Sequence, residues 1–354
     1  MNIYILDEKL NIIAIYDFYK SIIWSNRYYK VGDFELQIPL IKNVKDKIKQ
    51  DYFIYRDIDY NNGIIERPKV IEKIELIDNS NEYSLLVSGR DATALLDRRV
   101  IYPTEILNGE YENSILSLIT NHIISPSDSN RRISIIDINN TGLIEDTIDA
   151  QITGDTILKY LEDVSADYKI GFRTDLDILN KKLIFKLYRG TKRTGDDPVI
   201  ISRKFDNLIK YNYVKDKEKY KNMAFVAGAG EGSGRKLVKI GDELSELDRR
   251  EMFVDARDLQ ETDSEGQAIS DADYMEQLKQ RGSEKLTENK IDVTNSCEAE
   301  LDGTFTFNKD YFLGDEIICE SYQVFKERIV EVTESMTASG VKNELTYEEV
   351  EEDD

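Results

Sequence analysis

Strand-like alternation of apolar and polar residues marks both ends of this chain. In VGDFELQIPL, residues 31–40, apolar side chains fall at every second position from Phe34 onward. A period of two places these side chains on one face of a strand, so the segment predicts a half-buried strand. LGDEIICE, residues 313–320, repeats the order of an apolar residue, a Gly-Asp pair and a strand-like run. Both ends are therefore expected to be β-structure.

Each Gly-Asp pair is predicted to form a turn. Glycine adopts a positive φ without steric cost, and an aspartate side chain can hydrogen-bond to nearby backbone amides. Gly32 and Asp33 therefore turn the chain before Phe34, and Gly314 and Asp315 are interpreted in the same way. Two interpretations of these pairs stay open here. Each pair can be a turn of a kind that is common in proteins, or the two pairs can be equivalent turns in two similar modules.

Between the two ends, the spacing of apolar residues changes from strand-like to helix-like along the chain. Residues 1–102 show short strands and a hairpin, KVIEKIELI and YSLLVSG around a polar loop, with the spacing of a small barrel or sandwich. Residues 89–101 predict a short helix or turn. In 103–197, helical spacing at 113–124 and at 154–175, with Asp155 as the expected N-cap, is followed by paired strands. This part is predicted to be an inserted α/β domain.

The last two parts return to β-structure. Residues 198–290 predict strands around a glycine-rich loop and a helix at 270–289, and residues 291–354 predict a barrel of about five or six strands with an acidic tail. The loop 302–310 lacks the acidic ligands of a calcium loop. The fold class expected is α+β, mainly β, with two small β-barrel domains, an inserted α/β domain and a linking helix.

Charge and rare residues exclude several functions. The formal net charge is −22, whereas affinity for nucleic acid comes from Lys and Arg that replace counterions, so no specific nucleic-acid binding is expected. The single histidine, His122, and two cysteines, Cys297 and Cys319, match no metal or redox spacing, so no metal and no cofactor are expected. No segment approaches the roughly 20 apolar residues of a membrane span, and the N-terminus does not resemble a signal peptide, which indicates synthesis and folding in a cytoplasm.

The stretch AGAGEGSGR, residues 227–235, is the one segment that resembles a ligand loop. It does not match the G-x-G-x-x-G spacing of a dinucleotide site, and it lacks the Gly-Lys of a P-loop. A strand-like run follows it, so no helix N-terminus is available for a phosphate. We therefore predict a hairpin loop that can contact a partner, formed by Gly228, Gly230, Gly232, Gly234 and Arg235.

The order of these parts resembles the tail hub proteins of bacteriophages, especially the siphophage tail-associated hub family, which is shared with phage-tail-like particles. The resemblance covers nearly the whole chain. It is carried by VGDFELQIPL, VSGRDATALLDRRVI, MAFVAGAGEGSGR, QLKQRGSEKL and DYFLGDEIICES followed by RIVEVTES.

The resemblance implies a structural protein without catalytic residues. In that family, similar barrels stand at both ends of the chain, and a homotrimer supplies six of them, which adapts a sixfold tail tube or distal tail protein to a threefold spike or fibre. The Gly-Asp pairs would then be equivalent turns. Further implied partners are a tape-measure protein and DNA that passes through the lumen, and the implied location is the virion tail tip.

Two alternatives stay open. One is a carboxylate-based hydrolase of cell-envelope glycans, suggested by the acid-rich β-structure. The other is a glycan-binding tail module that uses some of the 21 tyrosines. Many siphophage members continue into long C-terminal regions that bind or degrade host polymers, so the end of this sequence near residue 354 favours a bare hub.

Overall fold

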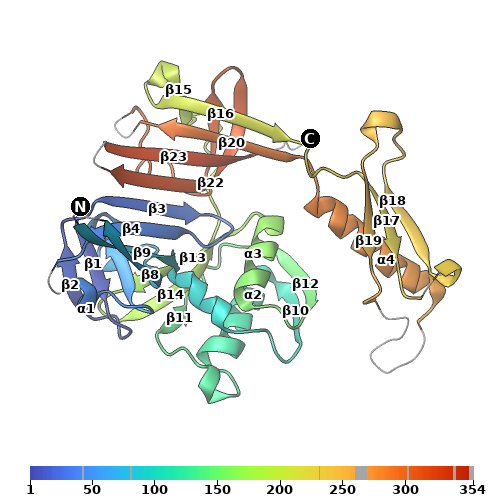
Figure 1. The fold of residues 1–354 in the computed structure, drawn as a ribbon, viewed down its shortest axis with the longest axis horizontal. Helices are drawn as coiled ribbons and strands as arrows, with labels where there is room; N and C mark the ends of the chain where they lie inside the picture. The colour runs from blue at the N-terminus through green and yellow to red at the C-terminus, as the bar shows by residue number, and fades with distance from the viewer. Residues whose placement is uncertain are drawn as a thin grey trace. The chain divides into compact units, whose positions relative to one another are not determined.

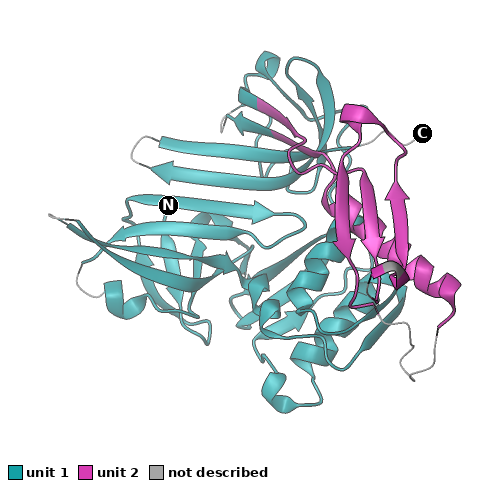
Figure 2. Ribbon diagram, turned by 45° about the vertical axis from the view of Figure 1, so that its right-hand side comes forward, with its two compact units in different colours: residues 1–211, 296–354 teal, residues 212–295 magenta. Residues whose placement is uncertain are grey.

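The computed structural model contains two compact units (Figure 2). Unit 1 comprises residues 1–211 and 296–354, and unit 2 comprises residues 212–295. The predicted boundaries of four domains are finer than this division and stay predictions. The structure describes residues 1–41, 44–79, 82–230, 232–259, 269–300, 303–337 and 340–350.

A 13-stranded sheet joins the two ends of the chain (Figure 1). Strand β22 lies antiparallel to β3, from Glu331 opposite Arg27 to Met336 opposite Ile22. Strand β21 pairs with β22, and β15 pairs with β21. The strands are, in spatial order, β16 (Leu208–Asp216), β20 (Asp292–Ala299), β23 (Gly340–Glu349), β22 (Val324–Thr337), β3 (Ser21–Arg27), β4 (Asp33–Pro39), β9 (Glu82–Asp91), β8 (Lys69–Asn79), β5 (Phe53–Arg56), β1 (Ile3–Leu6) and β2 (Ile12–Tyr16), with β21 (Glu316–Glu320) and β15 (Ile200–Ser202) off this path.

The mainly β, α+β fold class is confirmed, but the two separate small barrels are not. Each sheet in the described part of the chain follows an open order of strands. Unpaired amides and carbonyls at a sheet edge favour pairing with another strand. Pairing of β3 with β22 uses one edge of each terminal segment, so the two segments form one continuous sheet.

The segment between the terminal strands adds smaller sheets and helices to unit 1. Its core is shared with the N-terminal strands, because Phe53, Val70 and Leu107 belong to one buried cluster with Leu161 and Phe185. The 3₁₀-helix Ala92–Arg98 confirms the short helix expected near it. The elements are β6 (Tyr60–Asn61), β7 (Ile64–Ile65), β13 (Gly171–Asp177), β14 (Lys182–Tyr188) and β11 (Ile136–Ile138) in one sheet, β10 (Glu105–Glu110) with β12 (Thr147–Ile152) in another, and α1 (Val44–Lys47), α2 (Tyr111–Ile119) and α3 (Ile157–Tyr168).

The expected N-cap of α3, Asp155, is wrong by one residue. The cap is Thr156, whose hydroxyl accepts a hydrogen bond from the amide of Lys159 at 3.2 Å. The backbone of Asp155 is held elsewhere, because its carbonyl accepts from the amide of Ile101 at 2.8 Å. Threonine is a good N-cap, so the sequence placed the helix correctly but chose the wrong side chain.

Unit 2 is a three-stranded sheet covered by one long helix. The helix α4 (Asp271–Glu288) confirms the helix expected at 270–289, and it buries Tyr274, Leu278 and Gly282. A Cβ at Gly282 would lie 2.7 Å from Val226 Cγ2, so glycine here allows close packing of helix on sheet. The sheet order is β18 (Leu237–Gly241), β17 (Met223–Ala227) and β19 (Glu251–Asp255).

Candidate functional site

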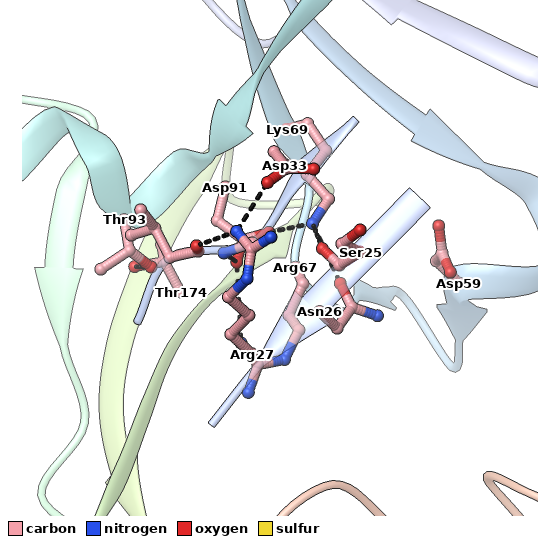
Figure 3. A network of polar contacts seen from close by, with 12 residues as sticks. Ser25, Asn26, Arg27, Asp33, Asp59, Arg67, Lys69, Asp91, Thr93 and Thr174 are labelled. Carbon is pink, nitrogen blue, oxygen red and sulfur yellow. Dashed lines mark hydrogen bonds and ion pairs between the residues drawn. The ribbon is translucent and has the colours of Figure 1, made fainter. Parts of the chain in front are cut away.

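A buried ion pair anchors the first Gly-Asp turn (Figure 3). Lys69 is completely buried and Asp91 is 2% exposed. The Lys69 ammonium donates to Asp91 Oδ1 and, at 2.7 Å, to the backbone carbonyl of Ser25. The other carboxylate oxygen of Asp91 accepts from the amide of Gly32 at 2.6 Å. The pair therefore ties β8 and β9 to the turn between β3 and β4.

Gly32 is needed for close approach rather than for a positive φ. Its φ lies outside the left-handed region, contrary to the reason the sequence suggested. A Cβ at this position would lie 2.0 Å from the carbonyl oxygen of Ser25. Burial lowers the pKa of Lys69, and the neighbouring carboxylate of Asp91 opposes that shift.

Asp33 and Phe34 face different surroundings. Asp33 accepts no backbone amide bond among the described residues; it pairs with Arg27 at 2.6 Å, and Arg27 also reaches Glu331 on β22 at 3.1 Å. Phe34 is buried with its ring centroid 5.5 Å from that of Trp24. The turn therefore contributes both to the core and to the contact between β3 and β22.

The second Gly-Asp turn is built differently. Gly314 has a φ of +95°, which favours glycine. Asp315 is buried and accepts hydrogen bonds from the amides of Thr191 at 2.7 Å and Phe312 at 2.9 Å, and it pairs with Arg193. In the second turn, the aspartate of the Gly-Asp pair accepts hydrogen bonds from nearby amides, as the sequence predicted. In the first turn, the acceptor is Asp91, which lies outside the pair.

Tyr28, in the segment before the first turn, contacts the second turn. It lies four residues before Gly32, and its ring is completely buried. A Cβ at Gly314 would lie 2.3 Å from Tyr28 Cε2, and a Cβ at Gly171 would lie 2.1 Å from the same atom. The Tyr28 hydroxyl accepts from the amide of Gly190 at 3.0 Å. The ring of Tyr28, which lies in the chain segment leading to the first turn, therefore packs against the second turn.

The glycine-rich loop belongs to unit 2, between β17 and β18. Arg235 folds back onto the end of β17, donating to the carbonyls of Gly228 at 2.7 Å and Ala227 at 2.8 Å and pairing with Asp255. The Tyr274 hydroxyl accepts from the amide of Ala229 at 2.8 Å. Gly230 and Gly232 have positive φ, and a Cβ at Gly232 or Gly234 would meet no atom within 4 Å.

The loop is therefore tightly closed at its base and open at its tip. The strand β18 follows its glycines, as predicted. A role for this loop, and for the two turns, in contacts with partners stays a prediction.

A protein-family model that describes Siphovirus ReqiPepy6 Gp37-like proteins matches residues 2–347. The chain belongs to this siphovirus family. A comparison with curated proteins finds no match.

Solved structures show the same fold in three tail proteins, two of them from prophages. The 43 kDa tail protein of prophage MuSo2 from Shewanella oneidensis has a TM-score of 0.56 at 16% identity, over 99% of this chain and 98% of that one. A tail protein from Neisseria meningitidis MC58 has 0.54 at 12% identity, over 98% and 96%. The prophage tail protein gp18 from Listeria monocytogenes EGD-e has 0.51 at 13% identity, over 99% and 96%. The resemblance to phage tail proteins is therefore confirmed.

The described part of this siphovirus family member has neither a membrane-spanning helix nor a metal-binding cluster. None of its helices there has the length and apolarity to span a bilayer. Those residues also contain no group of three or more His, Cys, Asp and Glu side chains arranged to hold a metal ion. Cys297 and Cys319 are buried free thiols, and burial raises the pKa of Cys297 to about 12.

Sequence reasoning missed the groups that fix the turns. Lys69, Tyr28 and Arg193 lie in segments with no local signal of burial or pairing. Asp91 lies within the quoted motif VSGRDATALLDRRVI, directly before the short helix, and a lone acid between a strand and an apolar helix was the only available signal.

The Arg235 side chain gives a prediction for the glycine-rich loop. Arg235→Ala removes two charge-assisted hydrogen bonds to carbonyls, so we expect unit 2 to lose about 1–3 kcal/mol of stability. Urea unfolding would measure the loss. Arg257→Ala is a matched control, because Arg257 also pairs with Asp255 but is 66% exposed. Equal effects of both substitutions would show that the ion pair, and not the closure of the loop, matters.

The buried histidine of this family member predicts a pH dependence of stability. His122 is 2% exposed, and its Nε2 lies 3.0 Å from Glu105 Oε1. Burial lowers its pKa below 6.5, Glu105 opposes this and Arg131 adds to it. The unfolded chain therefore binds more protons, so stability from this group is present above pH 6.5 and falls as the pH falls through the folded-state pKa.

We expect the urea midpoint of the chain to decrease between pH 7.5 and pH 5.5 and the decrease to be smaller in His122→Gln. The sequence has no other histidine, so this window isolates one imidazole. An unchanged slope in the variant would assign the pH dependence to carboxylates.

Proposed function

We propose that this protein is a structural hub at the tip of a phage tail or phage-tail-like particle. In this proposal a homotrimer forms a ring that adapts the sixfold tail tube or distal tail protein to a threefold spike or fibre, and the tape-measure protein is a further partner. The chain carries out no catalytic step. Membership of the siphovirus family and the phage tail fold support this role.

The pairing of β3 with β22 is the observation that carries the proposal. It places the N-terminal and C-terminal β-segments in one sheet, so each chain presents two β-segments that are fixed relative to each other. Each segment contains a long hairpin with an irregularity in its register, β8–β9 between Ile71 and Lys73 and β22–β23 between Ile329 and Glu331. Three chains would then present six such segments, as a sixfold partner requires.

The seam between β3 and β22 is reinforced by polar contacts. Ser25 Oγ lies 2.9 Å from Thr333 Oγ1, and Arg56 pairs with Glu334 at 2.7 Å. Arg56 is buried and also pairs with Asp59 at 2.8 Å. Such fixed geometry suits a ring component, because the angle between its two halves would set the closure of the ring.

The net charge of −22 is compatible with a channel component. An acidic wall repels phosphate, so DNA would pass without being held. This part of the proposal requires that acidic side chains face the lumen of the assembled ring.

Electron cryomicroscopy of intact particles would test the proposed hub. We expect three copies of the chain in one ring at the tail tip, with the distal tail protein or tube on one side and a spike or fibre on the other. Mass measurements on the purified chain are a weaker test, because ring formation can require the neighbouring proteins. Six copies in a ring, or a position away from the tip, would contradict the proposal.

A further inference from the structure

A polar hollow of about 710 Å³ lies on unit 1. Its lining comes from residues 58–67, 139–141, 173–191 and 307–315, together with Asn26. The Asn26 side chain accepts a hydrogen bond from Lys69 at 3.0 Å (Figure 3). The ion pair beneath the first turn therefore also holds one residue of the lining. Volumes of about 300–1,000 Å³ are typical of small-molecule sites.

Charges within this hollow are already paired. Its cationic side chains are Arg67, 3.8 Å from Asp91, Arg173, 2.9 Å from Glu66, Lys186, 2.7 Å from Asp175, and Arg189, 2.6 Å from Asp146. A phosphate or sulfate would have to displace one of these carboxylates. The pair of Arg67 with Asp91 is buried, so displacing that carboxylate would leave a buried charge uncompensated, and an uncharged ligand is favoured there.

Unpaired amides and exposed aromatic rings complete the lining. The side chains of Asn61, Asn139 and Asn308 make no hydrogen bond to the described part of the chain, and each amide offers two donor hydrogens and an acceptor oxygen. Tyr60 is 53% exposed and Phe312 is 42% exposed at the same hollow. Aromatic rings provide apolar faces beside these polar groups.

We propose that this hollow binds a neutral saccharide. The hydroxyl groups of a sugar would meet the three asparagine amides, and its C–H face would lie against Tyr60 or Phe312. The size fits a short oligosaccharide. Such a site goes beyond the structural hub, because ring formation does not require it and a hub without it would still assemble.

Saccharide binding can be measured on the full-length chain. A glycan array with neutral, sulfated and phosphorylated glycans would identify the class, and calorimetry with maltotriose and tri-N-acetylchitotriose would test neutral oligosaccharides in solution. We expect binding of neutral glycans, and at least a tenfold weaker affinity in Tyr60→Ala and in Asn139→Ala. Tyr83→Ala is the matched control, because Tyr83 is 54% exposed on β9 and outside the hollow, and it should bind as the natural chain does.

Each other outcome would overturn the proposal. If only sulfated or phosphorylated glycans bind, the ligand is an anion and not a neutral saccharide. If all variants bind with equal affinity, the glycan binds outside this hollow. If neither the array nor calorimetry detects binding, the hollow does not bind a saccharide. A photo-crosslinker at position 60 that captures a neighbouring tail protein in intact particles, without saccharide binding, would identify a protein as the occupant.

Discussion

Asp91→Ala should destabilise the protein by about 3–5 kcal/mol, the loss expected when one partner of a buried ion pair is removed. Lys69 would be left in a fully buried site with only the Ser25 carbonyl and the Asn26 side chain as acceptors, and its charged form would lose the carboxylate that opposes the lowering of its pKa. The amide of Gly32 would also lose its acceptor. Urea unfolding followed by circular dichroism would measure the loss.

Two further variants separate the buried pair from the turn itself. Asp33→Ala, in the same turn, removes a side chain that is 43% exposed, so it should cost about 1 kcal/mol or less. The double variant Lys69→Met with Asp91→Leu removes both of these charges but still leaves Arg67, which lies 3.8 Å from Asp91, without that carboxylate. It should therefore recover part of the stability lost by Asp91→Ala. A double variant no more stable than the single one would show that the backbone bond to Gly32 or the charge of Arg67, and not the charge of Lys69, dominates.

Local elements of this chain could be predicted because their signals are local. Helical spacing placed α3 and α4 within a few residues. Alternation placed β4, which begins at Asp33, and β21, which directly follows Asp315. The one-residue error at Asp155 reflects two adjacent side chains that can both act as an N-cap, Asp and Thr.

Long-range partners could not be predicted, because they depend on tertiary contacts. The Lys69 ammonium and the Asp91 carboxylate come from different strands and show no spacing rule in the sequence. The seam of β3 with β22 joins residues about 300 positions apart. The two Gly-Asp pairs look alike in sequence, but Asp91 anchors the first turn and Asp315 anchors the second. Similar sequences are therefore held by different tertiary contacts.

Gly314→Ala should cause the other large loss, about 2–5 kcal/mol. Two independent costs combine at this position. A φ of +95° is strained for a residue with a Cβ, which costs roughly 1–2 kcal/mol. The new Cβ would also lie 2.3 Å from the ring of Tyr28, which is buried and cannot move away, and overpacking costs typically about 1–3 kcal/mol.

Gly142→Ala isolates the first of these costs. Gly142 has a φ of +63°, and its Cβ would meet no atom within 4 Å, so only the backbone strain remains. Unfolding of both variants under one set of conditions gives the contribution of the Tyr28 contact as their difference. Equal losses would mean that the ring of Tyr28 yields. The contact between Tyr28 and the second turn would then be soft, and a rigid connection between the terminal β-segments would have to rest on the β3–β22 seam.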